Sequence, residues 1–117
     1  MGAAGLQGSG AMNETVHQLV RQVKEHLLKL YGDKIKQVIL YGSQARGEAT
    51  EDSDVDVLVV VDDSLDLPAV RNSLSDLLFD FLLETNELIS VIAIPEQLFN
   101  TYNSPFLLTV KEEGVVA

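Results

Sequence analysis

Two aspartates separated by a single residue, Asp54 and Asp56, are the residues whose type and spacing best suit chemistry. They begin an apolar run that continues to Val61, and a short β-branched run of this kind indicates a strand. Because side chains alternate across a strand, both carboxylates are expected on one face, about 7 Å apart. Like charges repel and an unpaired buried carboxylate is costly, so a cation is expected between them. All-oxygen ligands favour Mg²⁺ or Mn²⁺.

A glycine–serine pair, Gly42-Ser43, supplies a second feature of the same stretch. It ends another apolar run, residues 38–41, and residues 45–47 can begin a helical turn. At such a corner, backbone N–H groups and a hydroxyl point at an anion. Gly42 also has no Cβ, which allows a phosphate to approach its backbone closely. A phosphate at this corner and a metal at the aspartates describe a nucleoside triphosphate site.

These residues resemble a family signature. Gly42-Ser43, then ten residues, then Asp54-x-Asp56 is similar to the signature of the nucleotidyltransferase superfamily typified by DNA polymerase β. The fuller strings, G-S-Q-A-R-G-E at 42–48 and S-D-V-D-V-L-V-V at 53–60, resemble its minimal nucleotidyltransferase (MNT) branch. Those small prokaryotic proteins are commonly encoded beside a HEPN-domain partner, as the antitoxin of a toxin–antitoxin pair. The resemblance spans residues 16–116 and is specific at 41–60.

The resemblance implies an α/β (α+β) fold with a small mixed β-sheet flanked by helices. It implies transfer of a nucleoside monophosphate to a hydroxyl, with AMP from ATP as the expected group. Asp54 and Asp56 would bind Mg²⁺, and Gly42 and Ser43 would hold the β- and γ-phosphates. Arg46 would pair with a phosphate oxygen or fix the loop through a neighbouring acid.

In the antitoxins that this chain resembles, the acceptor is a tyrosine on the HEPN toxin, which is an all-helical protein. So small a chain has little room for an acceptor pocket. We therefore expect a partner protein to supply the acceptor, with a homo- or hetero-oligomer as a further expectation.

The third expected strand, residues 87–94, departs from the family pattern. Members with two-metal chemistry place a third carboxylate on this strand, but here Ser90 stands in its middle and only Glu87 lies near its start. Glu87 would serve as a catalytic acid if its longer side chain reaches the site. If it does not, one metal site is weakened, and so is deprotonation of the attacking hydroxyl.

Other interpretations of the same residues give different functions. Residues 51–56 lack the glycine and the downstream glutamate of a calcium loop, and residues 42–47 lack the Lys-Ser/Thr of a P-loop. Two alternatives stay open. Asp54 and Asp56 are solvated charges at a strand end, or the site is inherited and inactive. In the second case the chain is a binding module that neutralises its partner by contact alone.

Composition narrows the classes of protein. A length of 117 residues allows one domain with a modest core, and the absence of cysteine excludes disulfides and thiolate metal sites. The formal net charge is −10, and eight acids crowd between residues 48 and 66. Such a surface repels a phosphate backbone, so nucleic acid is not expected as the main partner. No membrane-span pattern or secretory signal is evident, which predicts a cytoplasmic protein.

The rest of the chain is expected to form helices around the sheet. Residues 1–11 are Gly- and Ala-rich and read as a flexible leader or expression scar, which leaves residues 12–117 as the single nucleotidyltransferase domain. Helical spacing predicts a helix over 16–30, carrying His17 and His26 on its surface, and one amphipathic helix over 68–82. Ser104-Pro105 predicts the start of a last helix that Gly114 ends.

Overall fold

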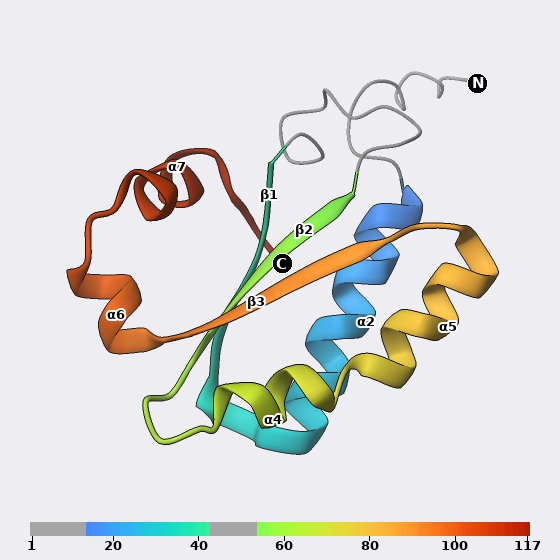
Figure 1. The fold of residues 1–117 in the computed structure, drawn as a ribbon, viewed down its shortest axis with the longest axis horizontal. Helices are drawn as coiled ribbons and strands as arrows, with labels where there is room; N and C mark the ends of the chain where they lie inside the picture. Colours follow the sequence, from blue (N-terminus) through green and yellow to red (C-terminus); the bar gives the residue numbers. More distant parts are fainter. Residues whose placement is uncertain (1–13, 43–53) are drawn as a thin grey trace.

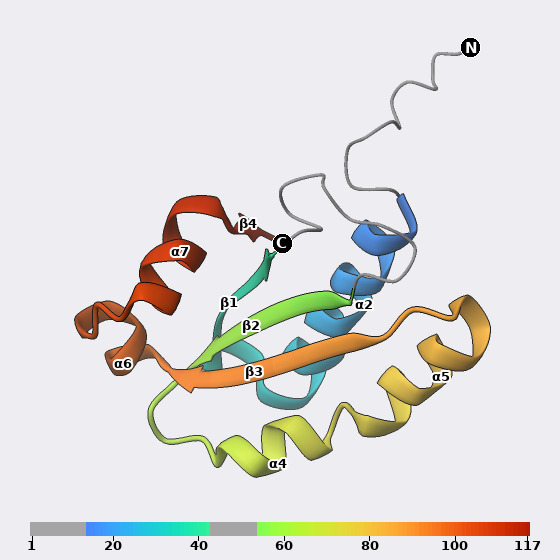
Figure 2. The same cartoon turned by 45° about the horizontal axis from the view of Figure 1, so that its top comes forward.

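The computed structural model describes residues 14–42 and 54–117. Its centre is a four-stranded sheet in the order β3-β2-β1-β4, shown in Figures 1 and 2. β1 is antiparallel to both β2 and β4, whereas β2 and β3 are parallel, so the sheet is mixed. The strands are β1 (Ile35–Tyr41), β2 (Val55–Val61), β3 (Ile89–Pro95) and β4 (Val115–Val116).

Helices cover both faces of this sheet, as Figure 1 shows. One face packs against α2, α4 and α5 through the larger apolar cluster, which includes Val23, Val57 and Leu74. The other face packs against α6 and α7 through a smaller cluster, which includes Leu58, Phe99 and Val110. The helices are α2 (Glu14–Tyr31), the 3-10 helix η1 (Gly32–Lys34), α4 (Leu67–Asn72), α5 (Ser75–Thr85), α6 (Glu96–Thr101) and α7 (Pro105–Glu113).

β2 is the strand on which the two layers meet. Six of its seven residues are buried, because β1 and β3 flank it and helices cover both of its faces. Only Asp56 keeps partial exposure within the strand. The alternation of its side chains sends Val55 and Val57 to the α2 face and Leu58 and Val60 to the α7 face. Asp56 therefore belongs to the α7 face.

The prediction of a mixed sheet flanked by helices is confirmed. The helix expected over 16–30 is α2, and the strand expected from Val55 to Val61 has those bounds. The strand expected over 87–94 is β3, which begins two residues later. The leader predicted at 1–11 lies outside the residues that the structure describes, so that prediction stays untested.

The single helix predicted over 68–82 is wrong. The segment forms two helices, α4 and α5, separated at Ser73 and Leu74. At this break the Ser73 and Ser75 hydroxyls donate to the carbonyls of Val70 and Asn72, so short polar side chains compete with the helical hydrogen bonds. The Ser73 carbonyl accepts from Nε2 of His26 at 2.8 Å.

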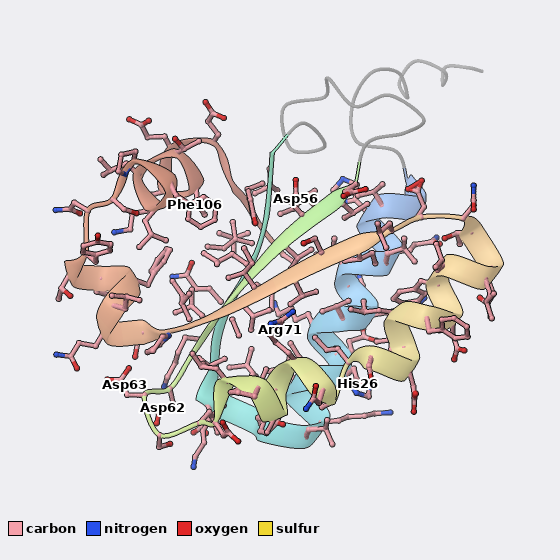
Figure 3. All side chains as sticks on the ribbon, viewed as in Figure 1. His26, Asp56, Asp62, Asp63, Arg71 and Phe106 are labelled. Atoms are coloured by element: carbon pink, nitrogen blue, oxygen red, sulfur yellow. The ribbon has the colours of Figure 1, made fainter. Side chains whose placement is uncertain are left out.

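This contact also corrects the expectation for His26. The residue is half-buried on α2, and Figure 3 places it beside the junction of α4 and α5. Since a carbonyl only accepts, Nε2 carries the proton in this contact. His26 therefore ties α2 to the break between the two helices. His17, in contrast, is exposed as predicted.

The end of the described chain adds β4, a strand that the sequence did not predict. Gly114 ends α7 as expected and lies so close to β1 that a Cβ there would collide with Ile39 Cγ2 and with the Val110 carbonyl. Glycine is required here by close packing, since its φ of −69° is open to other residues. The two residues of β4 can then pair with Ile39 and Leu40.

No helix in the ranges 14–42 and 54–117 has the length and apolar character needed to cross a membrane.

Ser104 caps the first turn of α7, and the contribution of this cap to stability can be measured. Its side chain accepts a 3.1 Å hydrogen bond from the Leu107 N–H. We expect Ser104→Ala to lower the free energy of unfolding by about 1 kcal/mol in a urea titration, because one helix-end donor loses its partner. Ser104→Asp keeps an acceptor and is expected to stay near the wild-type value; equal losses in both variants would contradict the cap.

Candidate functional site

Asp54 and Asp56 lie at the start of β2, beside the end of β1. The register places Tyr41 opposite Asp56, so both lie on the α7 face of the sheet. Asp54 is exposed and Asp56 is half-buried. Figure 3 shows Asp56 at the end of the sheet where β1 finishes and β2 begins. The structure thus brings the two predicted acids to one end of the buried central strand.

Gly42 packs directly against the Asp56 carboxylate. A Cβ built on Gly42 would come 2.6 Å from Asp56 Oδ2, a distance at which something must move. Gly42 also has φ +79°, a conformation that side chains other than glycine rarely adopt. Two separate reasons therefore require glycine at this position, and one of them is room for the carboxylate.

The electrostatics of the acid pair are unfavourable for the protein alone. Burial, and then the negative charge of Asp54, raise the pKa of the Asp56 carboxyl above its ordinary value. Both effects oppose ionisation of Asp56. A bound cation reverses them, because it offsets the repulsion and replaces lost hydration with oxygen ligation.

An aromatic pair adjoins the acids. The rings of Tyr41 and Phe106 meet edge to face, with centroids 5.4 Å apart and an interplanar angle of 83°. Burial, and then the charge of Asp56, raise the pKa of the Tyr41 hydroxyl, which stays neutral. The sequence alone does not predict this pair. The signal for Tyr41 was its place directly before Gly42, whereas nothing local pairs it with Phe106, 65 residues later.

The position beside Asp56 on β3 belongs to Ser90. The parallel register pairs Asp56 with Ser90, and Ser90 is exposed. Glu87 precedes β3. Ile89, two residues after it, packs on the α2 face of the sheet, whereas Asp56 lies on the α7 face. The Oε2 atom of Glu87 is buried and has no hydrogen-bond partner among the residues described.

Two further predicted site residues, Ser43 and Arg46, lie outside the described ranges. Of the predicted set, the structure therefore brings together Gly42, Asp54 and Asp56. Within residues 14–42 and 54–117 no three histidine, aspartate or glutamate side chains gather as a metal cluster. The acid pair accordingly suits a metal that takes one or two carboxylates and completes its shell with water and phosphate oxygens, as Mg²⁺ does.

Gly42→Ala tests the contact between the glycine and the acid. Gly32 is a matched control, because it has φ +60° but no atom within 4 Å of a built Cβ. We expect Gly32→Ala to cost about 1 kcal/mol of unfolding free energy, the strain of a left-handed alanine. Gly42→Ala should cost more, because it also displaces the carboxylate. Equal losses in urea titrations would show that the contact does not matter.

Known proteins resemble this chain over most of its length. The family pattern of the nucleotidyltransferase domain matches residues 20–102. An inferred protein adenylyltransferase of Methanocaldococcus jannaschii is 38% identical over 106 residues, which cover 90% of this chain and 98% of the relative. A second inferred adenylyltransferase of that organism is 43% identical over 44 residues, which cover 38% of this chain and 44% of the relative.

Solved structures share the fold. An inferred nucleotidyltransferase from Sulfolobus solfataricus superposes on this chain with a TM-score of 0.57 at 18% identity. The superposition covers 88% of this chain and 82% of that chain. A toxin–antitoxin structure with AMP-PNP superposes with a TM-score of 0.53, also at 18% identity, covering 81% of this chain and 69% of that chain. The pattern matches most of the chain, and the first relative is covered almost completely, so the chain belongs to the nucleotidyltransferase domain family.

Proposed function

We propose that this nucleotidyltransferase uses Mg²⁺ or Mn²⁺ to move AMP from ATP to a hydroxyl on a partner protein. The single observation that carries the proposal is the convergence of Asp54 and Asp56 beside Gly42, where burial and the charge of Asp54 raise the pKa of the Asp56 carboxyl. The inferred activity of the full-length relative, protein adenylylation, supports the choice of donor and acceptor class.

In this proposal the acid pair is the metal site. Mg²⁺ bound there would neutralise charge on the triphosphate and on the departing pyrophosphate. Asp56 is held by the buried strand β2 and by contact with Gly42, so its carboxylate has a defined position. Asp54 is exposed and remains open to an incoming reactant.

We assign the nucleotide phosphates to the corner that follows β1. Gly42 lies at that corner with φ +79°, and Ser43 and Arg46 come next in the chain. Backbone N–H groups, the Ser43 hydroxyl and the Arg46 guanidinium would bind the phosphate oxygens. These roles for Ser43 and Arg46 rest on the family signature.

Glu87 is the candidate third acid. Its buried, unpaired Oε2 favours a role that requires a charge partner, but the register gives the place beside Asp56 to Ser90. Glu87 contributes to catalysis only if its side chain turns around the start of β3. Glu87→Gln removes the charge and keeps the shape, so it distinguishes catalysis from packing.

For the partner we propose a HEPN-type helical protein that the chain modifies as an antitoxin, with a tyrosine as the acceptor. The solved toxin–antitoxin structures share this fold, and the family resemblance supplies the pairing. A net charge of −10 disfavours nucleic acid as the acceptor. Because the donor is ATP, we place the reaction in the cytoplasm.

A second function has one observation in its favour. Ser90 occupies the register position beside Asp56 where related two-metal enzymes carry an acid. A chain without that acid would neutralise its partner by contact alone. In that case nucleotide binding is dispensable for neutralisation.

Replacing both acids separates the two functions. We expect Asp54→Asn with Asp56→Asn to lower transfer of label from ATP to the co-encoded protein at least about a hundredfold, because a group that stabilises transition-state charge is lost. Asp76→Asn with Asp80→Asn removes the same charge from the exposed face of α5 and serves as the control. Full neutralisation of the partner by the double site variant would favour the contact function.

The raised pKa of Asp56 predicts a pH-dependent stability. With a metal chelator present, Asp56→Asn should melt at a higher temperature than the wild type near neutral pH, because the variant lacks the cost of a charged Asp56. That cost is complete above the raised pKa and disappears once the pH falls below the ordinary value of 3.8, where Asp56 is protonated in both the folded and the unfolded state. The melting-temperature difference should therefore shrink on acidification. A difference that is constant with pH would contradict the electrostatic cause.

A further inference from the structure

β3 forms an open edge of the sheet. Among the described strands it pairs only with β2. The Val55 N–H donates to the Leu88 carbonyl at 2.9 Å, and Val55 lies opposite Ile89. In a parallel pair the residues that bond one neighbour alternate along the strand, so the N–H and C=O groups of Ile89, Val91 and Ala93 point away from β2. They form a row of backbone donors and acceptors along the edge.

A groove of about 800 Å³ follows this edge. One wall is β3 from Leu88 to Ala93, and the floor is formed by α4 and α5. Leu88 and Ile92 are 52% and 39% exposed, so the wall offers apolar surface between the open backbone groups. Six residues of strand span about 20 Å, enough for an extended peptide.

The groove is continuous with the candidate site. Asp54 lines the groove, and Ser90, the register partner of Asp56, lies on its wall. Arg71 lines it from α4, and Figure 3 shows this side chain extending from α4 toward β3. The groove therefore joins an acid of the reacting pair to a basic side chain and a row of backbone hydrogen-bonding groups.

The edge lacks the usual features that prevent pairing. Natural edge strands are commonly protected by lysine, proline, bulges or very short length. β3 has seven residues, contains no lysine, and its proline is the last residue, Pro95. By contrast, the opposite edge strand, β4, has two residues. A seven-residue open edge that runs to an acid pair favours an extended chain as its occupant.

We propose that an extended segment of the acceptor protein, outside its helices, adds to β3 as a further strand and so delivers its hydroxyl to Asp54. This inference rests on the proposed transferase function and specifies how that site selects its acceptor. Backbone pairing with Val91 and Ala93 holds the segment, Leu88 and Ile92 receive apolar side chains, and Arg71 pairs with an acidic residue of the segment.

Pairing fixes the geometry of the transfer step. The acceptor oxygen attacks the α-phosphorus of ATP, forming one P–O bond while the bond to the pyrophosphate oxygen breaks. Pyrophosphate leaves with the electron pair, and the hydroxyl proton passes to bulk water. AMP is then attached to the acceptor side chain as a phosphodiester.

Amide hydrogen exchange tests the pairing directly. The probe is a library of short synthetic peptides with random sequence around a central tyrosine, captured on the immobilised protein with ATP analogue and Mg²⁺. In the free protein we expect rapid exchange at the amides of Val91 and Ala93 and slow exchange at Ile92. A captured peptide should slow both outward amides. Capture that leaves them unprotected overturns the proposal, and so does the absence of any captured peptide.

A proline at the edge gives an independent test. Ala93→Pro removes one outward N–H and keeps the bonds to β2, whereas Ala93→Val keeps the N–H and serves as the control. We expect the proline variant to bind captured peptides at least about tenfold more weakly than the valine variant. Equal affinities overturn the proposal. If the proline variant does not fold, the exchange measurement on the wild type decides.

Two readouts distinguish failure of the strand pairing from failure of the proposed transferase function. Calorimetric uptake of Mg²⁺ and ATP should be unchanged in Ala93→Pro; if the wild type takes up no nucleotide, the proposed function fails, whatever the peptides do. A second copy of this chain is the competing occupant of the edge. Outward amides that become protected with rising protein concentration, without peptide, would overturn the proposal in favour of self-association.

Discussion

The structure depends on the placement of two negative charges at the end of its most buried strand. β2 is held by neighbours on both edges and by helices on both faces, so its first residues have little freedom to move apart. Partial burial, and then repulsion from Asp54, raise the pKa of the Asp56 carboxyl. Packing energy from the apolar residues of β2 offsets this electrostatic cost, since a fully buried aliphatic side chain contributes about 1.5–3 kcal/mol. The strand thus holds both carboxylates on one face, an arrangement that their mutual repulsion opposes.

The strands and most helices could be predicted because their signals are local. β2 is a β-branched run bounded by polar residues, α2 has clear helical spacing, and α7 begins at a serine followed by proline. The break between α4 and α5 could not, because the segment from Val70 to Leu82 keeps a continuous apolar spacing. The break depends on serine hydroxyls and on His26, which approaches from another helix. β4 could not be predicted for a similar reason, since its two residues form a strand only through pairing with β1.

The candidate site divides in the same way. The spacing of Asp54 and Asp56 on one strand placed both acids, because the period of a strand is two residues. The contact between Gly42 and the Asp56 carboxylate was not predictable, since it requires the register of β1 against β2. That register gives Gly42 a second role. Its missing side chain allows a phosphate to approach the backbone, and it also leaves the space in which the Asp56 carboxylate lies.

The same register explains why the two sides of the acid pair differ. On the β1 side, Tyr41 lies opposite Asp56 in the register and packs against Phe106, and Gly42 lies against the Asp56 carboxylate. On the β3 side, Ser90 is short and exposed, and the strand beyond it has no partner among the described residues. A transferase must bring a donor and an acceptor to one point from different directions. The closed side suits a nucleotide whose phosphates need fixed ligands, and the open side suits a polypeptide whose backbone can complete the sheet. In the proposed strand pairing, the short side chain of Ser90 leaves room for the acceptor segment, room that a longer acidic side chain at that position would reduce.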